Sequence, residues 1–225
     1  RDRRRQGASQ GAQGRAPRAR RGPSGVIPTP VFGWHDEAEL RAFVADTAFA
    51  QIVGSRADGR LVSAQAPLVP AADGSFRFHV SRANAAVPAL DGARVLASVI
   101  GTHFYVSPDW YGAPDQVPTW NYRMVEIEGI ARRLTPDEAR EQVDSLSAVH
   151  ESALAPKPVW TSAKMEPRIL ERLLAGIVGF AIERPVLRGV AKLGQNKPER
   201  QAAGVIAALR ARGDAVGADA MAAAR

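Results

Sequence analysis

The sequence has no cysteine among its 225 residues. This absence excludes a disulfide scaffold, a thiol nucleophile, a zinc ribbon and cysteine-ligated iron–sulfur clusters. The sequence also lacks an uninterrupted apolar run of about 18 residues, so it predicts no membrane-spanning helix. No secretory signal pattern opens the chain, and we expect a cytoplasmic protein.

The common nucleotide-binding and hydrolase motifs are also missing. There is no G-x-G-x-x-G after an expected strand, no Walker lysine loop, no H-E-x-x-H and no G-x-S-x-G. The four histidines are scattered, and no pair has the spacing of metal ligands on one element. We therefore expect no metal site.

The excess of positive charge lies at one end of the chain. The net charge is +7, residues 1–22 hold eight arginines and one acid, and the other residues balance. Residues 1–25 contain no large apolar side chain, which predicts a disordered basic tail before a folded domain at 26–225. The tail fits either a leader upstream of the natural start or an arm that contacts phosphates. A transit peptide fits less well because the tail has no apolar face.

Short apolar runs joined by local turns predict an antiparallel β protein. Asp58-Gly59 between two such runs is typical of a hairpin, and Thr135 with Glu138 forms a capping box that begins a helix. The expected strands are 50–55, 60–69, 76–80, 94–106, 122–134, 176–182 and 185–193. The expected helices are one after Asp36, 135–150, 165–174 and one from Pro198 to Gly213. Because strands and helices do not alternate, this order predicts a β-barrel or α+β domain with peripheral helices and argues against a parallel Rossmann sheet.

Four segments have unusual polar or aromatic composition. At 79–84 an expected strand ends in Ser81, Arg82 and Asn84, a set of donors that suits a phosphate, although a solvated loop with a helix cap at Asn84 explains it as well. The segments 101–111 and 117–122 hold all three tyrosines and two tryptophans, which fits either stacking on a flat heterocycle or a dimer contact. The loop at 192–197 has lysine, glutamine and asparagine side chains that suit a ring carbonyl or a phosphate, although a polar loop before the Pro198 helix explains them equally well.

These segments, in this order, resemble the PaiB-like FMN-binding negative transcriptional regulators. The resemblance rests on Tyr105-Val106-Ser107-Pro108-x-Trp110-Tyr111, on Val117-Pro118-Thr119-Trp120-Asn121-Tyr122 and on Lys192-Leu193-x-Gln195-Asn196. Weaker matches are Ile27-Pro28, Arg82-Ala83-Asn84, Ile177-Val178-Gly179 and Gly204-Val205. The resemblance covers about Val26 to Met221.

The resemblance implies an antiparallel Greek-key split β-barrel, a homodimer and FMN between the subunits. By position, it implies that Ser81, Arg82 and Asn84, in a segment with Val80 and Ala83, hold the phosphate. It implies that Thr119, Trp120 and Asn121 line the ring or the dimer contact, and that Lys192, Gln195 and Asn196 close the site. Gln65 stands where the family usually has histidine, so it can donate and accept a hydrogen bond but cannot shuttle a proton near neutral pH.

Three functions remain open from the sequence. The first is a flavin-binding negative transcriptional regulator, for which DNA is a candidate partner. The second is a flavin-dependent oxidoreductase that acts on a small molecule, with the redox step carried by the flavin. The third is a barrel without flavin that serves as an interaction module. We expect no membrane partner for any of them.

Overall fold

The computed structural model describes residues 30–225, and the predicted tail at 1–25 and the Ile27-Pro28 match lie outside them. The strands are β1 Gly33–Trp34, β2 Phe49–Ser55, β3 Leu61–Pro67, β4 Val69–Pro70, β5 Phe76–Ser81, β6 Arg94–Val106, β7 Thr119–Arg133 and β8 Ile177–Lys192. The α-helices are α1 Glu37–Thr47, α2 Pro136–Ser152, α3 Pro167–Ala175, α4 Glu199–Ala211 and α5 Ala215–Ala223. Four 3₁₀ turns, Pro30–Phe32, Val87–Ala89, Pro108–Tyr111 and Ser162–Lys164, complete the elements.

One antiparallel sheet organises the fold, in the order β3-β2-β6-β7-β8-β5-β4, with β1 also paired to β8. Strands β6, β7 and β8 are consecutive neighbours, and β5 lies beside β8, which is the Greek-key order. Among the described strands, neighbours along this path are joined by backbone hydrogen bonds. Strands β3 and β5 are not paired in this way, and residues of both line one groove. The α+β split barrel predicted from the sequence is confirmed.

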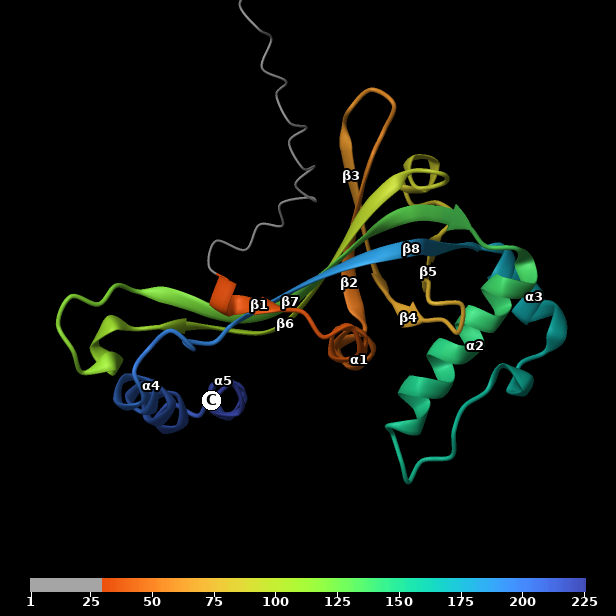
Figure 1. Cartoon of the computed structure of the whole chain (residues 1–225). Helices are drawn as coiled ribbons and strands as arrows, with labels where there is room; N and C mark the ends of the chain where they lie inside the picture. The colour runs from red at the N-terminus through yellow and green to blue at the C-terminus, as the bar shows by residue number, and fades with distance from the viewer. Residues whose placement is uncertain (1–29) are drawn as a thin grey trace, which may run out of the picture.

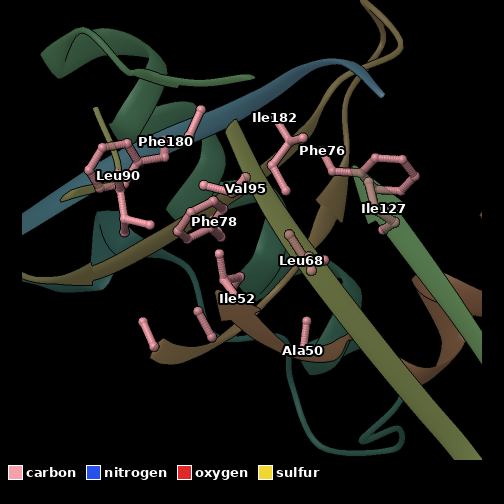
Figure 2. Packing of buried hydrophobic residues seen from close by; sticks show 14 of the residues in the cluster. Ala50, Ile52, Leu68, Phe76, Phe78, Leu90, Val95, Ile127, Phe180 and Ile182 are labelled. Atoms are coloured by element: carbon pink, nitrogen blue, oxygen red, sulfur yellow. The ribbon is translucent and has the colours of Figure 1, made fainter. Parts of the chain in front are cut away.

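The barrel encloses the larger of two apolar cores. Its side chains come from both halves of the sheet, and Figure 2 shows Ile52, Leu68 and Phe78 converging inside it. The rings of Phe78 and Phe180 stack with their centroids 5.4 Å apart, and neither side chain is exposed to solvent. This packing fixes β5 against β8 and so positions the end of β5.

The second core lies under an extension of the sheet. Strands β6, β7 and β8 have 13, 15 and 16 residues, which carries them well past the barrel, and α4 and α5 cover one face of the part that projects (Figure 1). Phe104, Val205 and Leu209 are buried between the strands and these helices. Helix α5 was not predicted from the sequence, because it is rich in alanine and has no strong apolar period.

The predicted final pair of strands is wrong, because residues 177–192 form the single strand β8. The register between β7 and β8 shifts between Glu128 and Ile130, and Arg184 has a φ of 46°. The resulting bulge accommodates Pro185, which cannot donate a ladder hydrogen bond. A proline that usually ends a strand is therefore carried inside one.

Candidate functional site

The first group of candidate residues lies at the split of the barrel. Gln65 of β3, Ser81 at the end of β5 and Asn84 line a groove of about 490 Å³. Arg172 and Leu173 of α3 form its opposite wall. A groove of this volume, whose lining mixes amide, hydroxyl and guanidinium groups with apolar side chains, suits the polar part of a cofactor.

The turn that follows β5 is held by its own side chains. The Asn84 amide N–H donates to the Ser81 carbonyl oxygen at 2.9 Å, and the Ala83 N–H donates to Ser81 Oγ at 3.3 Å. Asn84 Oδ1 accepts from the Ala86 N–H at 2.9 Å, just before a 3₁₀ turn. Val80 is buried in the barrel, so it shapes the strand and presents no polar side-chain atom to the groove.

Arg82 and Arg172 have different surroundings. Arg82 Nε donates to the Ala175 carbonyl at 2.6 Å, and its Nη2 donates to the Ile177 carbonyl at 3.1 Å, which ties β5 to the end of α3. Arg172 lines the groove, and within residues 30–225 it has no ion pair or side-chain hydrogen bond. Sequence analysis missed Arg172, although the strongly amphipathic pattern of 167–175 already marks a helix with one polar face.

The second group lies on the sheet extension. Lys192 Nζ donates to Thr119 Oγ1 at 2.5 Å across the end of the sheet. The Trp120 side chain is 53% exposed, and its ring lies 6.3 Å from that of Tyr105 and 5.8 Å from that of His103. These side chains form an aromatic surface next to an ammonium group.

The other members of the second group point elsewhere. Asn121 follows Trp120 along β7, so its side chain faces the opposite side of the sheet, where Nδ2 meets Met221 Sδ at 3.5 Å. Gln195 folds back on β8, because it accepts from the Leu193 N–H at 2.8 Å and donates to the Ala191 carbonyl at 2.6 Å. Asn196 is exposed in the turn beyond. Asn121 and Gln195 therefore hold the extension together.

A single chain does not bring the two groups together. The groove lies beside α3 at one end of the molecule, and the tip of the extension lies at the other (Figure 1). The outer face of the sheet connects them, since the registers place Gln65 opposite Gln51, Gln51 opposite Ser98 and Ser98 opposite Glu126. Trp120 lies on this same face, six residues before Glu126 along β7.

Charged groups on this outer face pair with one another. Arg188 donates to Glu126 at 3.2 Å and to Glu128 at 2.9 Å, and Arg94 donates to Glu128 at 2.8 Å. The hydrogen bonds from Arg188 and then Arg94 lower the pKa of Glu128 below its ordinary value. Large apolar side chains on the same face stay exposed, with Ile100 at 56% and Phe49 at 58%.

Comparison with known protein families identifies the family of the chain. Residues 27–184 match the family described as "Putative FMN-binding domain". The chain belongs to this FMN-binding family. The match covers the barrel, the groove and the aromatic strands of the extension, and it confirms the predicted resemblance.

A curated relative is similar to part of the chain. Over 116 residues the chain is 36% identical to the protease synthase and sporulation protein PAI 2 of Bacillus subtilis, a segment that spans 52% of this chain and 55% of that protein. The chain thus matches about half the length of this curated relative.

Solved structures share the fold at low sequence identity. The FAD and heme binding protein of Mycobacterium smegmatis aligns with a TM-score of 0.54 at 18% identity, over 72% of this chain and 73% of that one. A conserved hypothetical protein of Mycobacterium tuberculosis aligns with a TM-score of 0.52 at 18% identity, over 75% and 92%. At such identities the likeness establishes the fold alone.

Neither a membrane helix nor a metal cluster is found in the part of the chain that the structure describes. No helix within residues 30–225 is long and apolar enough to cross a bilayer. Across the same residues, no three of the His, Asp and Glu side chains gather closely enough to hold a metal ion.

Proposed function

We propose that the chain is an FMN-binding flavoprotein whose cofactor site is completed by a second copy of the chain. The observation that supports this most is the separation of the two candidate groups, a polar groove and an aromatic tip at opposite ends of one outer face. In a two-fold dimer formed through this face, the tip of each subunit would reach the groove of the other.

The residues present fit an FMN molecule divided between the two groups. In the groove, Arg172 offers uncommitted guanidinium donors to the phosphate, and Gln65 and Asn84 offer amide groups to the ribityl chain. At the tip, Trp120 offers a flat exposed ring for stacking, and Lys192 offers an ammonium group. When bound, the flavin would supply hydride and single-electron chemistry.

The outer face has the composition of an interface between copies. It combines exposed apolar side chains, such as Ile100, with the paired charges of Arg188 and its two glutamates. Burial of charged groups that are already paired costs less desolvation free energy than burial of isolated charges. We propose a homodimer on this basis.

The role carried over from the family is negative regulation of transcription. Direct reading of DNA has little support from the described surface: α4 and α5 form a helix pair, but α5 carries no basic residue. The second candidate is reduction or oxidation of a small molecule, favoured by the exposed aromatic tip at the proposed flavin ring.

Two experiments separate these candidates. A regulator should retain DNA of a specific sequence at moderate salt and after deletion of residues 1–25. An oxidoreductase predicts that NADH or NADPH bleaches the bound flavin.

The experiment for the cofactor compares FMN with riboflavin, which lacks the phosphate. For Arg172→Met we expect an affinity loss of about tenfold or more for FMN and little change for riboflavin, because a hydrogen bond to a charged group contributes roughly 1.5–3 kcal/mol. Arg82→Met tests the sequence-predicted phosphate donor, which does not line the groove, and we expect a smaller FMN-selective loss because two of its nitrogens already donate to carbonyls. Arg60→Met on the distant β2–β3 turn is the control. Equal losses for both ligands would refute the phosphate role.

A further inference from the structure

A separate cleft is lined by residues of α1, β7, β8 and α5. Helices α1 and α5 lie on the same side of the sheet (Figure 1). The volume of the cleft is about 550 Å³, within the range of small-molecule sites. Small side chains, including Ala42, Ala191 and Ala220, leave it open. It shares none of its walls with the groove at the barrel split.

Arg123 of β7 supplies the only basic group of this cleft among the described residues. Its guanidinium carbon lies 4.4 Å from the ring centre of Trp34 and 5.1 Å from that of Phe43. Within residues 30–225 no carboxylate reaches it at ion-pair distance, and its side chain makes no hydrogen bond. Stacking occupies the face of a guanidinium and leaves its N–H groups at the edge free to donate.

The positions of the Trp34 and Phe43 rings are fixed by neighbouring residues. A Cβ on Gly101 would lie 2.6 Å from the Phe43 ring, so only a glycine at this position leaves room for the ring. The Trp34 Nε1–H donates to Glu39 Oε2 at 2.6 Å, which fixes the indole. The guanidinium is therefore positioned before any ligand arrives, which lowers the entropic cost of binding.

The charge around the cleft limits the ligand. Glu39 and Asp46 also line it, on the same face of α1. Neither carboxylate lies at ion-pair distance from Arg123, and two carboxylates in the lining disfavour a dianion such as a phosphate monoester more strongly than a monoanion. A single carboxylate on an apolar body satisfies both the arginine and the alanine walls.

We propose that the cleft between α1 and α5 binds a small amphipathic monocarboxylate, with Arg123 donating to the carboxylate and the apolar body lying against Trp34 and the alanines of α5. This site is distinct from the proposed flavin site and does not depend on it. The proposal assigns to Arg123 a ligand-binding role beyond that of a clamp between α1 and β7.

The test is calorimetric titration of the full-length protein, saturated with FMN, with 2-naphthoate. We expect one naphthoate per chain, and weaker binding of the neutral isostere 2-naphthylmethanol. Arg123→Met should reduce naphthoate affinity by about tenfold or more without changing the affinity for the alcohol. Arg60→Met, an exposed arginine far from the cleft, should bind naphthoate like the wild type.

Because Arg123→Met also removes the cation–π contacts, Ala223→Leu provides a second variant that narrows the mouth and leaves Arg123 in place. Ala223→Leu should reduce the affinities for naphthoate and naphthylmethanol alike. The proposal is overturned if the wild type binds no naphthoate at millimolar concentration, if Arg123→Met binds it as tightly as the wild type, or if naphthoate displaces FMN.

Discussion

Replacing Gly204 by alanine tests how α4 supports the sheet extension. An ideal Cβ at this position would lie 2.4 Å from the backbone carbonyl oxygen of Trp110, which belongs to the 3₁₀ turn Pro108–Tyr111. Because a carbonyl oxygen cannot turn aside like the end of a side chain, α4 would have to move away by nearly 1 Å to reach ordinary contact. Intrinsic helix propensity acts in the opposite direction, since alanine favours a helix over glycine by about 1 kcal/mol.

The two effects give a prediction with a definite sign. Overpacking typically costs about 1–3 kcal/mol, and contact with a backbone atom that cannot turn aside belongs to the upper half of that range, so after the gain in helix propensity we expect Gly204→Ala to lower the free energy of unfolding by about 1–2 kcal/mol. Urea denaturation followed by circular dichroism measures it. Ala203→Ser on the exposed side of the same helix should stay within about 0.5 kcal/mol of the wild type. If Gly204→Ala is more stable than the wild type, the close approach of α4 to Trp110 is not a feature of the folded protein.

Three further predictions concern the core, a charged pair and the aromatic tip. Phe78→Ala should lower the free energy of unfolding by about 3–5 kcal/mol, because it removes an unexposed ring stacked on Phe180; a loss below 1 kcal/mol in urea denaturation would contradict this packing. Hydrogen bonds from Arg132 and then Thr135 lower the pKa of Glu138 from 4.5 to about 2, so this carboxylate stabilises the fold above pH 4.5 and loses its effect as the pH falls through about 2. Glu138→Gln should therefore lower the free energy of unfolding by about 1 kcal/mol at pH 7, allowing for solvent screening. In urea denaturation, this difference from the wild type should vanish toward pH 2. A difference that stays constant with pH would refute the assignment. Trp120→Ala should weaken both self-association and FMN binding in sedimentation runs that monitor flavin absorbance, whereas loss of only one would separate the tip from the shared site.

Local patterns in the sequence predicted most of the elements. The hairpin at Asp58-Gly59 joins β2 and β3 as expected. The capping box of Thr135 and Glu138 is present with both hydrogen bonds, because it depends only on residues within one turn. The helix expected after Asp36 also forms, and the Asp36 side chain accepts from the Glu39 N–H, whereas the Glu39 side chain accepts from the Trp34 indole and does not complete a capping box.

Features that depend on distant residues were not predictable in this way. Pro185 ends a strand by local rules, yet the bulge opposite Gly129 keeps β8 continuous. Asn121 belongs to the motif that carries the family resemblance, but the alternation of β7 turns it toward Met221 and away from Trp120. The roles of Arg172 and Arg123 emerge only when α3 meets the groove and α1 meets β7.

Flavin that binds between two copies of the chain should be held only by the dimer. Sedimentation of the purified protein titrated with FMN, monitored at a flavin wavelength, measures this. We expect flavin absorbance to sediment with a dimer at one FMN per chain, and dilution below the dimer dissociation constant to release the flavin. Flavin that sediments with a monomer, or a dimer that retains no flavin, would contradict this expectation.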